Sequence, residues 1–247
     1  MPEKSISVIV PALNEESVLA STLESIRASR PLEVILVDGG SVDGTQKVAS
    51  GHGAKILFSA PGRARQMNCG AAAASGSVLL FLHADTRLPP QFDCLVWEAL
   101  ACPGAVAGAF ELRIDAPAPK LRWIERLANW RSRRLHMPYG DQAIFVRAEL
   151  FHSIGGFSEL PIMEDFEFMR RLRRNGRIEI IRKPVLTSAR RWVETGIVRT
   201  TLANQLAIVA YLMGTEPARI AGWYHRYRKR RSLNGRSSEA QAETPSL

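Results

Sequence analysis

The first ninety residues alternate short apolar runs with stretches in which apolar residues recur at helical spacing. Runs rich in β-branched residues predict buried strands, and recurrence every three to four residues predicts an amphipathic helix. The predicted strands are residues 5–10, 33–37, 55–58 and 77–82. The helices predicted between them are residues 14–28, 44–50 and 62–74. Because parallel strands need crossover connections and these strands are apolar throughout, the order predicts an α/β fold with a mostly parallel sheet and helices on both faces.

The pattern becomes less regular after Pro89. Further helices are predicted over residues 91–100, 120–134, 164–174, 196–213 and 217–227. Further strands are predicted over residues 105–114, 142–146, 178–181 and 185–189. We therefore expect one domain over residues 1–195, with halves at about 1–88 and 89–195, followed by a helical part over residues 196–231. Residues 232–247 are small and polar, which predicts a disordered tail.

The composition is that of an ordinary globular protein, with 247 residues of which 46% are hydrophobic and 23% charged. Three cysteines, with no C-x-x-C spacing and no histidine cluster nearby, favour neither a disulfide framework nor a structural zinc site, so we expect buried, reduced thiols. The apolar run near the N-terminus is too short for a signal sequence, and no apolar window is long enough to span a bilayer. We expect a cytoplasmic protein.

Two segments account for the net charge of +9. Residues 219–236 hold seven lysines and arginines and no acid, and residues 119–134 hold six against one acid. Such segments attract phosphates, anionic lipid headgroups or nucleic acid, and a solvated helix face explains them equally well. Aromatic residues interleaved with cations over residues 223–231 suit a membrane interface, so peripheral contact of this C-terminal helix with the inner face of an anionic membrane is one expectation.

Polar and acidic residues follow three of the predicted strands. They are residues 11–16 (PALNEE), 38–44 (DGGSVDG) and 83–85 (HAD). Ligands of open parallel sheets bind beyond the carboxyl ends of the strands, and clustered carboxylates favour a divalent cation. Asn14 and Asp43 also fit ordinary turn and helix-cap roles. The chain lacks the Gly-rich dinucleotide fingerprint and the P-loop motif, which speaks against those two site types.

Four segments in this order resemble glycosyltransferase family 2, the inverting transferases with the GT-A fold. They are SVIVPALNEE, VDGGSVDGT, FLHADT and MEDFEFMRRLRRNG, and the resemblance covers about residues 5–195. The chain looks most similar to a bacterial subgroup associated with arsenosugar biosynthesis. The resemblance implies a nucleotide-diphosphate sugar donor, with a UDP-sugar favoured over a GDP-sugar, and a small-molecule or lipid acceptor.

The resemblance also implies roles for individual residues. The implied nucleotide-binding residues are Pro11, Ala12, Asn14, Glu15, Asp38, Ser41, Asp43, Arg63 and Asn68. The segment His83-Ala84-Asp85 stands where the family has its D-x-D metal motif and departs from it at the first position. Asp85 is expected to bind Mn²⁺ or Mg²⁺, while His83 joins as a ligand, contacts the ribose or packs. A solvated helix charge is the alternative explanation for Arg63.

Asp165 matches the catalytic base of the family's E-D motif. Inversion at an anomeric carbon needs a carboxylate across the sugar from the leaving group, able to take the proton of the acceptor hydroxyl. The implied acceptor-side residues are Gly140, Asp141, Glu164, Arg190 and Trp192. Favourable charge at a helix N-terminus would also explain the Glu164-Asp165 pair, and core packing would explain Trp192.

The expected activity is metal-assisted single displacement from a nucleotide sugar to a hydroxyl group. The alternatives are a non-catalytic module that binds nucleotide sugar or nucleic acid, and a nucleotidyltransferase. The loop after the first strand is acidic, whereas both a nucleic-acid site and a nucleotidyltransferase would favour basic residues there.

Overall fold

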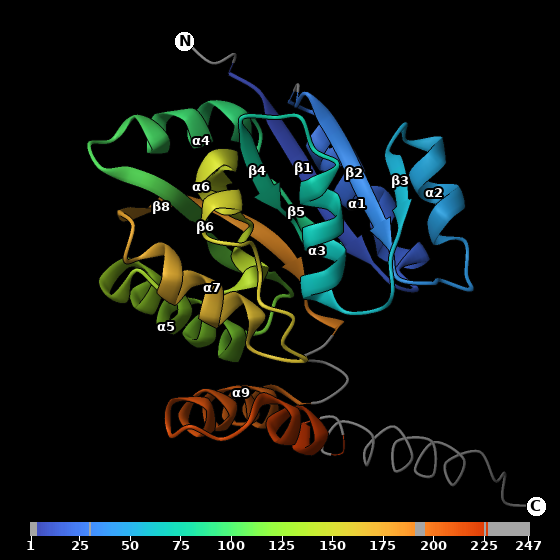
Figure 1. Cartoon of the computed structure of the whole chain (residues 1–247). Helices are drawn as coiled ribbons and strands as arrows, with labels where there is room; N and C mark the ends of the chain where they lie inside the picture. The colour runs from blue at the N-terminus through green and yellow to red at the C-terminus, as the bar shows by residue number, and fades with distance from the viewer. Residues whose placement is uncertain (1–3, 30, 191–195, 225, 227–247) are drawn as a thin grey trace, which may run out of the picture. The chain divides into compact units, whose positions relative to one another are not determined.

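The computed structural model describes residues 4–29, 31–190, 196–224 and 226. The chain divides into two compact units, residues 1–159 with 164–188, and residues 160–163 with 189–247. The first unit contains an eight-stranded sheet and the helices that cover it (Figure 1). The predicted tail at 232–247 and most of the basic segment at 219–236 lie outside the described residues.

The strands are short except for two long ones in the second half of the sheet. They are β1 (Ile6–Ala12), β2 (Glu33–Asp38), β3 (Lys55–Phe58), β4 (Val78–Phe81), β5 (Thr86–Arg87), β6 (Ala105–Asp115), β7 (Ile144–Arg147) and β8 (Arg177–Ser188). The helices of the first unit are α1 (Glu16–Arg27), α2 (Thr45–Gly51), α3 (Arg63–Ala72), α4 (Phe92–Ala101), α5 (Pro119–Leu135), the 3₁₀ turn η1 (Gly140–Gln142), α6 (Ala148–Ser153) and α7 (Glu164–Leu172). The second unit contains α9 (Ile197–Leu212) and a helical stretch over residues 217–224.

The strand order is β3-β2-β1-β4-β7-β6-β8-β5. The first four strands are parallel, as predicted, while β7 runs antiparallel to both β4 and β6. β6 and β8 are parallel, and β5 pairs antiparallel with β8. In Figure 1, α3 crosses in front of the parallel half and α1 lies behind it, so helices cover both faces. The predicted α/β class is confirmed, and the sheet is parallel from β3 to β4 and mixed beyond β4.

Every residue of β1 is buried, because this strand lies between β2 and β4 in the parallel half of the sheet. A cluster of aromatic rings then joins β4 to the second half of the fold. Phe81 at the end of β4 lies 4.9 Å from the Phe157 ring, and Phe157 lies 4.2 Å from Phe168 in α7. All three side chains are buried. The cluster joins the end of β4 to α7. The His83-Ala84-Asp85 segment follows β4, and Glu164 and Asp165 are the first two residues of α7.

Several predicted boundaries are wrong, each for a local reason. The strands predicted at 178–181 and 185–189 are one strand, β8, which pairs with β6 through an irregularity between Ile181 and Pro184. Proline cannot donate to the ladder, so it favours an irregularity over regular pairing. The strand predicted at 142–146 begins at Ile144 because Ala143 has a positive φ of 49°. The sequence patterns also missed β5, η1 and α6.

The helix caps and the cysteines also differ from expectation. The first residue of α2 is Thr45 and its N-cap is Gly44, although Asp43 still accepts a hydrogen bond from the Thr45 N–H at 3.0 Å. The three cysteines are free, as predicted, but none is buried, and Cys94 is exposed.

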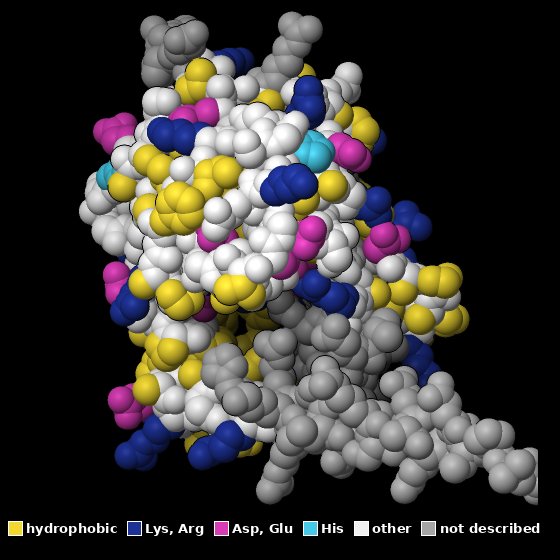
Figure 2. Space-filling view, turned by 90° about the vertical axis from the view of Figure 1, so that its right-hand side faces the viewer, with side chains coloured by type: hydrophobic (Ala, Val, Ile, Leu, Met, Phe, Trp, Pro, Cys, Tyr) yellow, Lys and Arg dark blue, Asp and Glu magenta, His cyan; other side chains and the backbone are white. Residues whose placement is uncertain are grey.

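On the face of the molecule that carries α2 and β3, cationic and acidic side chains are scattered among one another (Figure 2). In the second unit, α9 and the following helical stretch are joined by a hydrogen bond from the Tyr224 hydroxyl to Asn204 Oδ1 at 2.7 Å. Over the described part of the chain, none of the helices combines the length and apolar character needed to cross a bilayer.

Candidate active site

The loops that follow β1 and β2 are locked together by reciprocal hydrogen bonds. The Asn14 N–H donates to Ser41 Oγ at 2.9 Å, and the Val42 N–H donates to Asn14 Oδ1 at 2.9 Å. Asn14 takes a left-handed conformation with φ of 56°, which asparagine tolerates better than most residues. The Glu15 N–H donates to Thr45 Oγ1 at 2.8 Å. Asn14, Glu15 and Ser41, predicted to bind the nucleotide, are therefore brought together.

Asp38 is fully buried and holds the turn that follows it. Its carboxylate accepts hydrogen bonds from the Ser41 N–H at 3.0 Å, from Gln46 Nε2 at 2.9 Å and from the Ser41 hydroxyl. In the same turn, a hydrogen bond from the Thr45 hydroxyl is the main cause of a lowered pKa at Asp43. Both carboxylates thus organise the loop, and their contact with a nucleotide stays a prediction. Pro11 and Ala12 are buried at the end of β1.

Gln66 in α3 is a site residue to which sequence reasoning gave no role. Its Nε2 donates to the Ala12 carbonyl and to the Val37 carbonyl, both at 2.8 Å. These carbonyls belong to β1 and β2, so one buried amide joins the ends of the two strands from which the interlocked loops begin. Ala64 and Met67 beside it are buried, whereas Arg63 and Arg65 are exposed, so the available signal was an uncharged polar residue at an apolar-face position of the helix.

The first turns of α3 and α7 meet through a charge pair. Arg63 Nη1 lies 3.9 Å from Glu164 Oε1, and the Glu164 side chain is largely buried. A predicted nucleotide-binding residue and a predicted acceptor-side residue are therefore in contact. Asn68, one turn further along α3, is engaged elsewhere: its Nδ2 donates to the Phe157 carbonyl at 2.8 Å and its Oδ1 accepts the Phe157 N–H at 2.9 Å. These bonds account for Asn68 as a link to the loop before α7, and its predicted contact with the donor is untested.

The candidate base and the candidate metal motif meet at Gly140. Asp165 Oδ2 accepts the Gly140 N–H at 2.7 Å, and Asp165 Oδ1 accepts the Phe166 N–H at 2.7 Å. A Cβ atom on Gly140 would lie 3.0 Å from His83 Nε2 and 3.3 Å from Asp165 Oδ2. The segment after β4 and the first turn of α7 therefore lie close together, on either side of Gly140.

Asp85 is half-buried and has no cationic partner among the residues that the structure describes. Among these described residues, its carboxylate accepts a hydrogen bond from the Thr86 hydroxyl at 3.4 Å, while its backbone carbonyl accepts the Ser188 N–H at 2.9 Å. Within the described ranges, no three His, Cys, Asp or Glu side chains are grouped as a complete metal site. Asp85 alone could therefore supply one carboxylate ligand to a hard cation, whose other oxygen ligands would have to come from elsewhere, such as a phosphate group.

Tyr139 and Asp141 flank Gly140 in the sequence. The Arg131 guanidinium carbon lies 3.4 Å from the centroid of the Tyr139 ring. Burial raises the pKa of the Tyr139 phenol, and although Arg131 opposes this shift, the charges of Asp165 and Asp141 add to it. Tyr139 therefore stays protonated at neutral pH and retains its O–H as a donor.

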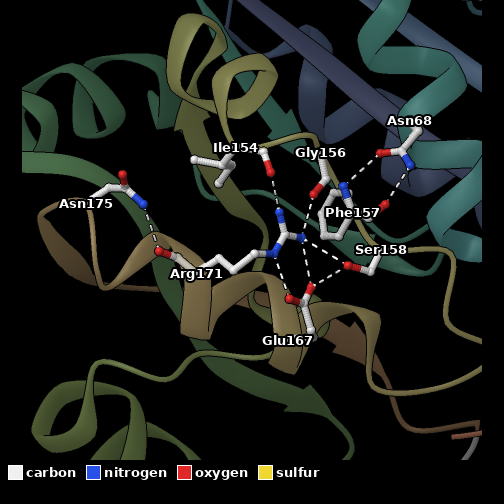
Figure 3. A network of polar contacts seen from close by, with 8 residues as sticks. All are labelled: Asn68, Ile154, Gly156, Phe157, Ser158, Glu167, Arg171 and Asn175. Carbon is white, nitrogen blue, oxygen red and sulfur yellow. Dashed lines mark hydrogen bonds and ion pairs between the residues drawn. The ribbon is translucent and has the colours of Figure 1, made fainter.

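Arg171 fixes the loop that leads into α7 (Figure 3). Its guanidinium donates to both carboxylate oxygens of Glu167, at 2.7 and 2.8 Å, and to the carbonyls of Ile154 and Gly156, each at 2.6 Å. Asn68 holds Phe157 from the other side of this loop. At Gly156, φ is 65° and a Cβ atom would lie 2.7 Å from Asn68 Oδ1, so both the conformation and the space require glycine. The turn formed by Gly155, Gly156 and Phe157 is thus held in place from both sides and supports α7.

The structure does not place two of the predicted acceptor-side residues, Arg190 and Trp192, with the residues described above. Arg190 belongs to the second unit, and Trp192 lies outside the described residues. Their roles stay predictions.

A sheet whose parallel half ends in acidic loops, with a second acidic motif brought to the same edge, defines an enzyme of the GT-A class. The family model described as "Glycosyl transferase family 2" matches residues 7–158, and the chain belongs to this family. The predicted family is confirmed, and the chain is a glycosyltransferase.

Curated relatives agree with this assignment. The chain is 32% identical to an uncharacterized glycosyltransferase of Mycobacterium tuberculosis over 184 aligned residues. The alignment covers 68% of each chain. It is 30% identical over 189 residues to a PGL/p-HBAD biosynthesis glycosyltransferase of Mycobacterium bovis, which covers 68% of this chain and 69% of that one.

Solved structures share the fold at lower identity. TarS of S. aureus matches with a TM-score of 0.59 and 19% identity, over 75% of this chain and 60% of that one. Glucosyl-3-phosphoglycerate synthase of Mycobacterium tuberculosis, crystallised with Mn²⁺ and UDP-glucose, matches with a TM-score of 0.57 and 22% identity, over 75% of this chain and 70% of that one. The chain therefore spans about 60% of the length of the TarS structure that it matches.

Proposed function

We propose that this chain is an inverting transferase that moves a sugar from a nucleotide-diphosphate donor to an acceptor hydroxyl by single displacement. The observation that carries the proposal is the meeting of His83, from the segment after β4, and Asp165, from α7, at Gly140. A single displacement needs a base close to the group that binds the donor. The proximity of Asp165 to His83 supports this arrangement.

Asp165 is the proposed base. Each of its carboxylate oxygens accepts one backbone N–H, so the group is oriented, and each oxygen keeps a further lone pair. Asp165 takes the proton of the acceptor hydroxyl as that oxygen bonds to the anomeric carbon. The bond between the anomeric carbon and the diphosphate oxygen breaks, and the electron pair leaves with the nucleoside diphosphate. No covalent enzyme intermediate forms, so the anomeric configuration inverts.

The proposed donor is a UDP-sugar, with a GDP-sugar as the alternative. Enzymes that share the fold are crystallised with UDP-GlcNAc and with UDP-glucose, which supports this class of donor. Asp85 and His83 would hold a divalent cation, Mn²⁺ or Mg²⁺, that supplies charge neutralisation on the leaving diphosphate. Arg63 would add positive charge on the donor side. The acceptor is a small molecule or a lipid.

Two substitutions test this proposal. Asp165→Asn keeps the size of the side chain but cannot accept a proton, so we expect kcat to fall by about 10²- to 10⁴-fold with UDP affinity nearly unchanged. Asp85→Ala should weaken binding of UDP in the presence of Mn²⁺ and leave the weak binding without metal unchanged. Both effects are measurable by calorimetry with UDP and by product formation over a panel of UDP- and GDP-sugars. Transfer by Asp165→Asn at the wild-type rate would remove Asp165 as the base.

A further inference from the structure

We infer that the outward face of α5 is a docking surface for an anionic lipid bilayer. The inference concerns binding alone and does not depend on which sugar the enzyme transfers.

The outward face of α5 carries a stripe of large apolar side chains. Trp123, Leu127 and Trp130 are 71%, 62% and 53% exposed, and their spacing places them on one side of the helix. Leu121 and Ser132 on the opposite side are buried, and α5 packs on β6, where Asn129 exchanges hydrogen bonds with the Leu112 backbone at 2.7 and 3.0 Å. Leaving two tryptophans and a leucine in water on a single helix is costly, and a contiguous patch of this kind marks a binding surface.

Cations border the stripe on both sides. Lys120 and Arg134 have no partner among the described residues, and Arg126 contacts only the Trp123 ring, with its guanidinium carbon 5.3 Å from the centroid. The helix has a single acid, Glu125, and this residue is buried and paired with Arg122 at 3.0 Å. The outward face therefore presents positive charge without a compensating acid.

This combination matches the chemistry of a bilayer interface. Tryptophan and leucine side chains partition into the boundary between headgroups and acyl chains, while flanking lysines and arginines meet anionic headgroups. Single-stranded RNA would also use the tryptophans, by stacking, but an aliphatic residue between them offers no stacking surface. The regular apolar stripe with cations along both borders therefore favours a lipid surface over RNA.

The helix is rigidly attached to the candidate site. Arg131 donates to the Met137 carbonyl at 3.0 Å and covers the Tyr139 ring, and Ser132 donates to Gln142 Oε1 at 2.7 Å. The segment from Met137 to Gln142 includes Gly140, which contacts Asp165. Docking through α5 would therefore bring the acceptor side of the site to the membrane surface.

Co-flotation of the full chain with vesicles tests the inference. We expect the protein to float with phosphatidylcholine vesicles that contain about one third phosphatidylglycerol, less so at high salt, and not with phosphatidylcholine alone. The triple variant Trp123→Ser/Leu127→Ser/Trp130→Ser should lower the partition coefficient at least about tenfold. The variant Lys120→Glu/Arg134→Glu should lower it to a similar degree.

Matched controls separate this surface from general stickiness. Arg182→Glu/Lys183→Glu makes the same change in net charge at exposed positions of β8, and Leu32→Ser removes an exposed leucine before β2, so both should bind like wild type. Thermal unfolding of every variant checks that it is folded.

Four results would overturn the inference. They are failure of the wild type to float with anionic vesicles, wild-type flotation of both α5 variants, equal loss in the β8 control, and tryptophan-dependent binding of an RNA oligonucleotide without vesicle binding. A large fall in the unfolding temperature of the triple variant, with no vesicle binding by wild type, would show instead that the chain itself covers the stripe.

Discussion

His83 Nε2 and Asp165 Oδ2 both lie within 3.3 Å of the position that a Cβ atom on Gly140 would occupy. His83 follows β4, whereas Asp165 stands in the first turn of α7, so the contact joins two motifs that are far apart in the sequence. Gly140 is therefore a spacer whose missing side chain lets the imidazole and the carboxylate approach one another.

Gly140→Ala should lower kcat by about tenfold or more, because the new methyl group would push the Asp165 carboxylate from its position by a few tenths of an ångström. The free energy of unfolding should change much less, since the residue does not need a left-handed φ. Gly51→Ala is the matched control, because a Cβ atom there would meet no atom within 4 Å. Steady-state kinetics on both variants measures the difference, and equal kcat values would show that the spacing at Gly140 is not critical.

Asn68→Ala should reduce the free energy of unfolding by about 2 to 4 kcal/mol, because it leaves both the N–H and the carbonyl of Phe157 without their partner. Asn175→Ala, which removes one exposed hydrogen bond to the Arg171 carbonyl, should cost less than about 1 kcal/mol. Urea unfolding gives both values. If Asn68→Ala instead weakened UDP binding with little change in stability, the predicted contact with the nucleotide would be its main role.

Arg171→Lys should lower both the free energy of unfolding, by about 2 to 4 kcal/mol, and kcat. An ammonium group cannot reproduce the bidentate contact with Glu167 together with the two carbonyl contacts that hold the loop before α7. Arg170→Lys makes the same change on the exposed side of α7 and should be close to neutral. Urea unfolding and steady-state kinetics on both variants measure these effects. Equal unfolding free energies and equal kcat values for the two variants would show that Arg171 does not hold the loop before α7.

Glu167 should make stability depend on pH below neutrality. Burial alone would raise the pKa of Glu167, but hydrogen bonds from Arg171 and Ser158 and the charge of Arg171 outweigh burial and hold it below its ordinary value of 4.5. A lowered folded-state pKa adds stability above the unfolded-state pKa, and this stability is lost as pH falls through the folded-state value.

We therefore expect the advantage of wild type over Glu167→Gln, in free energy of unfolding, to be constant near neutral pH and to shrink below about pH 4.5. Urea unfolding over a pH series measures it, with Glu149→Gln at an exposed site as the control. An advantage that grew on acidification would contradict the assigned direction of the pKa shift.

The parallel half of the fold was predictable because its strands are continuous apolar runs and its helices are regularly periodic. Residues 33–37 and 55–58 became β2 and β3 with at most one residue of error. The mixed half was not predictable to the same degree, because β7 is only four residues long and its partners β4 and β6 lie far away in the sequence. Local patterns do not specify such pairings.

The placement of the segments after β1, β2 and β4 at one edge of the sheet was also predictable, since the carboxyl ends of parallel strands share an edge. The roles of Gln66 and Arg171 were not, because a polar residue in a helix shows its partners only once the loops around it are placed. Asp38 illustrates the same limit: its position was foreseen, but its hydrogen bonds to Ser41 and Gln46 were not.

The mutual hydrogen bonds between the turns after β1 and β2 make these two turns a single module. If one turn were replaced with that of another enzyme, groups in the other turn would lose their hydrogen-bond partners. Examples are the Val42 N–H and the Thr45 hydroxyl, which bond to Asn14 and Glu15. Engineering of the donor preference would therefore require both turns to be exchanged together. Gln66, which bonds to the ends of both strands, would have to be exchanged with them.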